Sequence, residues 1–149
     1  MIIFVLAFIF GCKQKDANIA LYQKMIECEK LTQNYKALFI IPSVGCQGCI
    51  SSAEAFVKRN MDKRNDVLFV FTNVKSVKLL RMKLGEYVLR KDNLLLDTTN
   101  VFLNHKNKNN IYPTIVYLKY GNVDRVEYVS PENKYSIGQL MDMLDKPKL

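Results

Sequence analysis

The sequence predicts an α/β protein in which helices flank a central mixed sheet of four to five strands. Two strands, predicted at 37–41 (ALFII) and 67–73 (VLFVFTN), each open with five apolar residues, as strands buried on both faces of a sheet do. Each is followed by residues at helical spacing, and strands joined by helices pair in parallel. The segment 112–129 predicts two further strands with Gly121-Asn122 at the turn, and this hairpin makes the sheet mixed.

The remaining elements follow from the spacing of apolar residues along the chain. A helix is predicted over 16–35, and another begins near residue 47 after Pro42 ends the first strand. The apolar stripes of the first, second and last helices are Ile19, Tyr22, Met25 and Ile26; Ile50, Ala53, Phe56 and Val57; and Ile137, Leu140, Met141 and Leu144. Further elements are a helix at 76–84 closed by Gly85, a short strand within 93–97, one or two helical turns within 98–103 and a C-terminal helix at 133–144.

The composition indicates one globular domain with a basic surface. Of the 149 residues, 49% are hydrophobic, which is enough to bury one core. The formal net charge is +8, and Lys75, Lys78, Arg81 and Lys83 are spaced along one predicted helix. They form no dense block and accompany no nucleic-acid-binding motif. We therefore interpret them as a solvated helix face and expect no nucleic-acid partner.

The first twelve residues predict an export signal. Residues 1–10 are apolar, which is about the length of a signal-peptide core and too short for a membrane-spanning helix of about 20 residues. Ile9-Phe10-Gly11-Cys12 resembles a lipobox, in which the cysteine is diacylated after cleavage. We expect a signal peptide with lipobox over 1–12, lipidation at Cys12, a tether and helix over 13–36, and the main domain over 37–149. The alternative is an uncleaved N-terminal anchor. Both place the domain in the cell envelope, membrane-attached and facing the periplasm, where disulfides persist.

A CxxC pair, Cys46 and Cys49, lies at the predicted strand-to-helix junction. A helix N-terminus favours a thiolate at Cys46, and Cys49 follows one turn later, within disulfide reach. Gly45 and Gly48 keep the surroundings small, so another sulfur can approach. This arrangement suits thiol–disulfide exchange in which Cys46 attacks and Cys49 resolves.

Other interpretations of the cysteines stay open. His105, the single histidine, could join the pair in a copper or zinc site, although a solvated loop position is the simpler expectation for it. A purely structural disulfide is a second alternative, although the tiny loop that it closes would stabilise the fold little. Cys28 lies in the first predicted helix, and we interpret it as a buried or half-buried free thiol.

Tyr112-Pro113-Thr114 opens the hairpin, where the proline lacks a ladder donor. A cis Tyr112–Pro113 bond would explain it; the alternative is a trans proline that marks the start of the strand.

Together these features resemble a thioredoxin-like fold: strand 37–41, the CxxC sequence CQGC opening a helix, strand 67–71, then YPT opening a hairpin, and a last helix. The likeness covers about residues 37–149. The extra helix and short strand within 76–97 resemble the insertion of membrane-anchored TlpA/ResA-like thiol–disulfide oxidoreductases, and the lipobox agrees with that branch. The resemblance implies a three-layer sandwich. In its sheet, the strands that begin at Val67, Ala37, Pro113 and Val123 would lie side by side in that order, and the strand near Leu94 would lie at the outer edge.

The resemblance also implies roles for individual residues. Cys46 would be the exposed nucleophile, Cys49 the buried resolving thiol, and Pro113 a cis-proline that faces the disulfide and helps Tyr112 and Thr114 dock the partner chain. Two positions depart from the family's pattern. Gly45 replaces an aromatic residue before the first cysteine, and Ile40 replaces a buried acid in the preceding strand; Glu54 lies beyond the motif and is expected to be solvated.

The predicted function is thus thiol–disulfide exchange on extracytoplasmic proteins, without a cofactor. The expected partners are a protein thiol or disulfide and a membrane electron donor or acceptor whose identity the sequence leaves open, as it does the redox direction. The alternative is a thioredoxin-like lipoprotein that binds copper, zinc or a partner protein without redox turnover.

Overall fold

The computed structural model describes residues 17–31 and 35–146. In chain order its elements are α1 (Ala17–Cys28), β1 (Ala37–Pro42), α2 (Gln47–Asn60), β2 (Val67–Thr72), α3 (Val77–Leu84), the 3-10 helix η1 (Glu86–Arg90), β3 (Leu94–Leu96), the 3-10 helix η2 (Lys108–Ile111), β4 (Thr114–Lys119), β5 (Asn122–Tyr128) and α4 (Ser136–Asp145).

The strands form one mixed sheet in the order β3-β2-β1-β4-β5. β1, β2 and β3 are parallel, whereas β4 is antiparallel to both β1 and β5. Every residue of β1 and β2 is buried, because helices or packed loops cover both faces of the sheet centre. The α/β class and the mixed sheet are as the sequence predicted, and the strand order and the edge position of β3 are as the thioredoxin-like resemblance implied.

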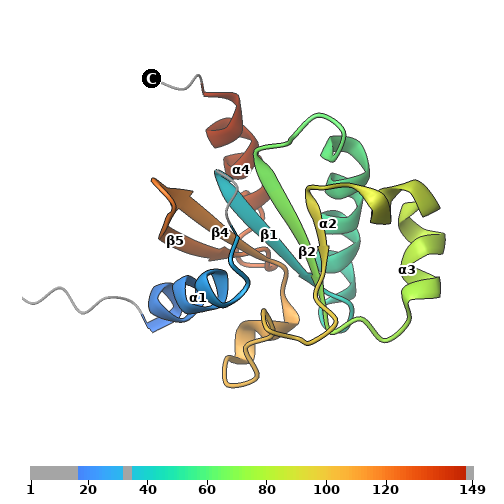
Figure 1. The fold of residues 1–149 in the computed structure, drawn as a ribbon, viewed down its shortest axis with the longest axis horizontal. Coiled ribbons are helices and arrows are strands. Elements are labelled where there is room, and N and C mark those ends of the chain that lie inside the picture. The colour runs from blue at the N-terminus through green and yellow to red at the C-terminus, as the bar shows by residue number, and fades with distance from the viewer. Residues whose placement is uncertain (1–16, 32–34, 147–149) are drawn as a thin grey trace, which may run out of the picture.

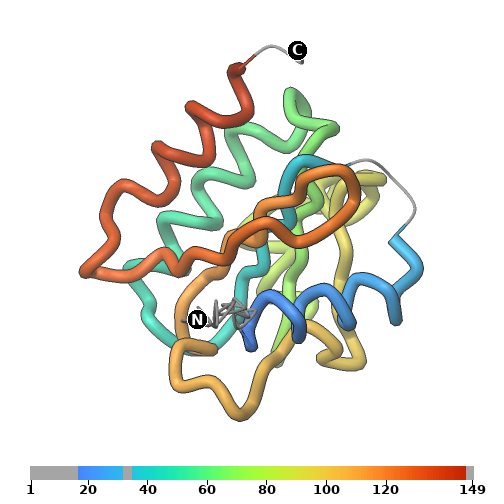
Figure 2. The backbone as a smooth tube through the Cα atoms, turned by 90° about the vertical axis from the view of Figure 1, so that its left-hand side faces the viewer, coloured from blue at the N-terminus to red at the C-terminus, as the bar shows by residue number. Residues whose placement is uncertain are grey.

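Two apolar clusters lie on the two faces of the sheet. Alternate residues of β1 and β2 join α2, α3 and α4 in one cluster, whose largest members include Phe39, Phe69 and Phe71. The other alternate residues meet α1 and Phe102 in the second cluster. Figure 1 accordingly shows α1 on one side of the sheet and α2 with α3 on the other. Figure 2 shows the β4–β5 hairpin between α1 and α4.

Two local boundaries differ from the sequence-based expectation. α1 ends at Cys28 rather than near residue 35, and Lys30 then has a positive φ of 49° that ends the helical path. The hairpin turn is Tyr120-Gly121, one residue earlier than expected, and Asn122 already belongs to β5. Both turn residues have positive φ, 52° and 78°, as a two-residue turn of the I′ kind requires, so glycine takes its second position.

Candidate redox site at the end of the first strand

The two cysteines lie at the start of α2 and are joined in a disulfide. Cys46 is the N-cap residue of the helix, Cys49 lies in its first turn, and their Cα atoms are 5.3 Å apart. Both are half-buried, while Gln47 and Gly48 between them are exposed. The expectation that Cys49 would be buried is therefore wrong, because the first turn of α2 projects beyond the core and Ile50 is the first of its residues to enter it.

Gly45 lies directly against the backbone of Ile111. A Cβ at this glycine would lie 2.8 Å from the carbonyl carbon of Ile111 and closer still to its oxygen, and the φ of 151° also favours glycine. The same oxygen accepts a hydrogen bond of 2.9 Å from the N–H of Cys46. An aromatic side chain before the first cysteine is thus excluded, because the segment that leads to Pro113 fills that space.

The Tyr112-Pro113-Thr114 segment is brought to the site through that contact with Ile111. Pro113 and Thr114 are buried and Tyr112 is half-buried. Thr114 pairs with Ile40 of β1, so this strand lies directly beside the one that leads to the cysteines. The described residues contain no cis peptide bond, so the Tyr112–Pro113 bond is trans, the isomer that X–Pro bonds prefer, and the cis form implied by the resemblance is wrong here.

Two positions near the site bear on whether a carboxyl group lies close to the cysteines. Ile40 is apolar and 3% exposed, so the strand before the cysteines carries no acid at the position where the resemblance implied one. Glu54 was expected to be solvated, but its side chain is only 14% exposed, because α3 packs beside it and Lys83 pairs with its carboxylate at 3.1 Å.

Asp97 is a buried carboxylate that the sequence analysis did not single out. It accepts hydrogen bonds from the Thr72 hydroxyl at 2.8 Å and from the N–H groups of Val101 and Phe102, both at 2.9 Å. The carbonyl of Thr72 in turn accepts a bond from the N–H of Ser43, in the loop before the cysteines, at 3.1 Å. Asp97 therefore supports that loop through Thr72. The sequence did offer a signal for this role: Asp97 lies between a predicted strand and a turn-rich segment, where an aspartate side chain often accepts hydrogen bonds from nearby backbone N–H groups.

Beneath the loop, α1 contributes a second buried polar group, the phenol of Tyr22. It helps to line a small cavity together with Ile40, Pro42, Thr72 and Thr114. Burial raises the pKa of Tyr22 to about 12, the charge of Tyr128 adds to this, and a hydrogen bond with Thr114 lowers it in part. The phenol is thus neutral at ordinary pH.

The remaining candidate residues lie apart from the pair or outside the described part. His105 is exposed in its loop, as expected. The described residues hold no group of three or more His, Cys, Asp and Glu side chains that could bind a metal ion, so His105 does not join Cys46 and Cys49 in one. Cys28 is exposed, which corrects the expected burial, because it lies at the end of α1 on its outer side. Cys12, with the proposed lipobox, lies outside the described residues.

Comparisons of the chain with protein-family models, with curated proteins and with solved structures return no match. The mixed sheet, its flanking helical layers and the CxxC disulfide at the end of β1 are consistent with a thioredoxin-like sandwich. No helix within 17–31 or 35–146 is both long and apolar enough to cross a membrane.

Proposed function

We propose that the protein carries out thiol–disulfide exchange through Cys46 and Cys49, as a thioredoxin-like oxidoreductase of the TlpA/ResA-like kind that acts on extracytoplasmic proteins. The observation that carries the proposal is the half-buried disulfide at the N-terminus of α2, with the exposed residues Gln47 and Gly48 between its cysteines. A sulfur of another chain can reach this position. A disulfide placed only for stability would close a loop too short to stabilise the fold much.

The exchange runs in two balanced steps. In the reduced protein the Cys46 thiolate attacks a substrate disulfide, a mixed disulfide forms, and one substrate sulfur leaves as a thiolate that takes up a proton. The Cys49 thiolate then attacks the sulfur of Cys46, the Cys46–Cys49 disulfide forms, and the second substrate thiolate leaves. Two electrons pass from the pair to the substrate. The reverse sequence oxidises a substrate dithiol.

Cys46 is the better nucleophile on structural grounds. As the N-cap residue of α2 it lies beside the unpaired N–H groups of the first helical turn, and these with the positive end of the helix dipole stabilise a thiolate. Its own N–H is already bonded to Ile111, which fixes the backbone while the sulfur reacts. Cys49 is positioned to resolve, because the disulfide shows that its sulfur reaches that of Cys46.

The proposal includes the cellular setting. An envelope location with Cys12 as the lipid anchor agrees with a CxxC protein that exchanges disulfides with secreted proteins and with a dithiol or disulfide partner at the membrane. Mass spectrometry of the chain expressed in bacteria tests the anchor directly. A diacylated N-terminal cysteine at position 12 is expected, and an intact residue 1 would contradict it.

Reduction of insulin with dithiothreitol as the electron source tests the proposed activity on the full chain. Cys46→Ser is expected to abolish the catalysed rate, and Cys49→Ser is expected to accumulate a mixed disulfide between Cys46 and the substrate. Cys28→Ser is the matched control, because Cys28 is an exposed free thiol, and full activity is expected. Activity that survives Cys46→Ser would overturn the mechanism. A titration of the wild-type pair against glutathione gives its reduction potential and so the redox direction.

A further inference from the structure

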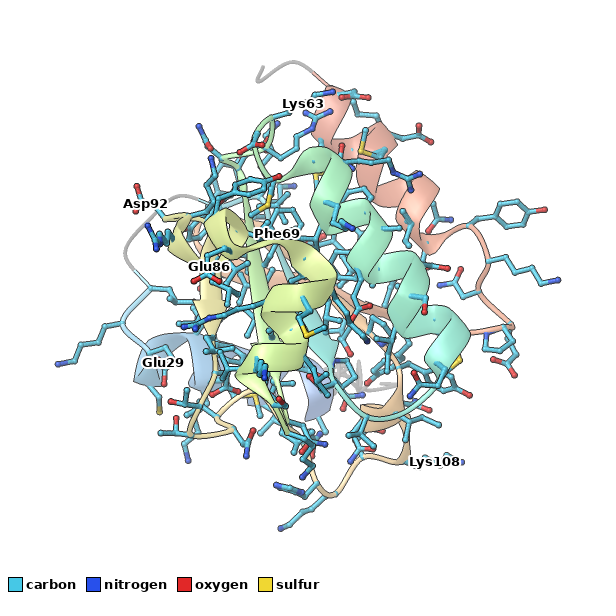
Figure 3. The ribbon with its side chains drawn as sticks, turned by 90° about the vertical axis from the view of Figure 1, so that its right-hand side faces the viewer. Glu29, Lys63, Phe69, Glu86, Asp92 and Lys108 are labelled. Carbon is cyan, nitrogen blue, oxygen red and sulfur yellow. A yellow bond between two sulfur atoms is a disulfide. The ribbon has the colours of Figure 1, made fainter. Side chains whose placement is uncertain are left out.

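A cleft of about 100 Å³ opens beside the redox site, between α2, α3 and the loop before the cysteines. Ser43, three residues ahead of Cys46, is part of the lining of the cleft. The other lining residues are Glu54 of α2 and, from the α3 region, Lys75, Ser76, Leu79, Leu80 and Lys83. Figure 3 shows α2 and α3 side by side on this face of the molecule. The cleft lining therefore begins three residues ahead of Cys46 in the chain.

The rim of the cleft is positively charged. Among the described residues that line it, Glu54 alone is a carboxylate, and it is neutralised by Lys83, whose Nζ lies 3.1 Å and 3.3 Å from the two carboxylate oxygens. Lys75 and Lys78 are exposed, and neither forms an ion pair with a described residue. Lys75 thus gives the cleft lining a positive charge without an acidic partner among the described residues, and Lys78 adds a second such charge three residues further along the chain.

Apolar side chains of the cleft and of the segments next to Cys46 are exposed as well. Leu79 is 59% exposed in the cleft and Val44 is 48% exposed in the loop before the pair. Ile111, on the other side of Gly45, is 42% exposed. Exposed aliphatic residues next to a reactive centre suit contact with a polypeptide better than contact with a nucleic-acid backbone.

We propose that this cleft binds an acidic segment that flanks the reactive cysteine of the protein substrate. The inference rests on the proposed exchange activity and names its substrate class. Lys75 and Lys78 attract Asp and Glu side chains of the incoming chain, and Leu79 and Val44 contact its aliphatic parts. Charge complementarity of this kind raises the association rate and selects among partners, and it weakens as salt screens the charges.

The test uses three peptides, each with one cysteine held as a mixed disulfide with 2-mercaptoethanol. They differ only in whether three neighbouring residues are Asp, Asn or Lys. Reduced full-length protein transfers two electrons to each disulfide, which releases the peptide thiol and mercaptoethanol, and the second-order rate is measured at low and high salt. The Asp peptide is expected to react about tenfold faster than the Lys peptide at low salt, with a smaller difference at high salt.

Two double variants locate the effect. Lys75→Gln with Lys78→Gln is expected to reduce the Asp-to-Lys rate ratio to about threefold or less. The control, Lys58→Gln with Arg59→Gln, removes the same charge from the last turn of α2, roughly 16 Å along the helix from its start. It is expected to keep the ratio within about twofold of wild type.

Two results would overturn the inference. One is a wild-type ratio near one; the other is an equal loss of the ratio in both variants, which would assign the effect to net charge rather than to the cleft. The neutral disulfide of 2-mercaptoethanol, reacted with wild-type protein alone, separates this failure from that of the exchange activity. If that small disulfide reacts while peptide charge has no effect, the cleft proposal alone is wrong; if nothing reacts, both are.

Discussion

The residues before Cys46 and those after it are held in different ways. On the preceding side, the N–H of Ser43 is bonded to Thr72 of the neighbouring strand, and the N–H of Cys46 is bonded to Ile111. Gly45 lies between these two anchor points with no room for a Cβ atom. The backbone path into the redox site is therefore fixed by segments that are distant in the sequence.

On the following side, the first turn of α2 has space around it. Gln47 and Gly48 are exposed, and within the described part of the chain no side chain caps the helix and no atom lies within 4 Å of a Cβ placed at Gly48. Gly45 and Gly48, one on each side of Cys46 in the sequence, thus have different roles: Gly45 allows a close backbone contact, and Gly48 leaves open space. The sequence pattern suggested the second role for both. The difference indicates that the position of Cys46 is set from the preceding side, while the following side leaves access for a substrate.

Of the substitutions that test this difference between the two sides, Gly45→Ala should reduce stability the most. The new methyl group would overlap the Ile111 carbonyl in a backbone conformation that favours glycine, so we expect a loss of about 2–4 kcal/mol in the free energy of unfolding. Urea denaturation of the oxidised protein measures it. The insulin reduction rate should fall as well, because Ile111 and Cys46 must separate. A loss below about 0.5 kcal/mol would show that the loop can move aside.

Asp97→Asn tests the second anchor point on the preceding side. An amide cannot accept from all three donors that now bond to the carboxylate, so a buried donor loses its partner and we expect a loss of about 2 kcal/mol. Thr72→Val removes one of these bonds and should cost less. The matched control is Asp92→Asn, an exposed acid nearby, with a change within about 0.5 kcal/mol. Equal effects of the two Asp→Asn changes in urea denaturation would argue against this support.

Gly48→Ala should have the smallest effect, and of the opposite sign. Alanine loses less backbone freedom than glycine when a helix forms, and the site has space for the methyl group, so we expect a gain of about 0.5 kcal/mol. The exchange rate should stay within about twofold of wild type. Destabilisation here, measured in the same urea titration, would mean that the following side is as constrained as the preceding side.

Much of the fold could be predicted because its determinants are local. The apolar runs of β1 and β2, the spacing in α2 and α4, and Ser76 with Gly85 at the two ends of α3 each signal an element within a few residues. The hairpin turn lies one residue earlier than predicted, because either neighbour of Gly121 can form a two-residue turn with it. The pairing of Lys119 with Asn122 makes Tyr120 the partner of Gly121 in the turn.

The candidate site was predicted in part for the same reason. The CxxC spacing and its place at a strand-to-helix junction are local, and the structure confirms both. The burial of Glu54 and the exposure of Cys28 were not predictable, because each depends on which face of a helix meets another element. The support given by Asp97 likewise depends on a hydrogen bond to a residue 25 positions away.

By itself the sequence determined the α/β class and the pair of thiols one helical turn apart, since these depend on periodicity and spacing, whereas the strand order was implied by the resemblance to a thioredoxin-like fold. Only the tertiary structure decided how the pair is held. It brought the Ile111 carbonyl against Gly45 and Asp97 under Thr72, and it placed Lys75, which has no acidic partner among the described residues, in the lining of the adjacent cleft. Such contacts join segments that are far apart in the chain, and a pattern of neighbouring residues carries no record of them.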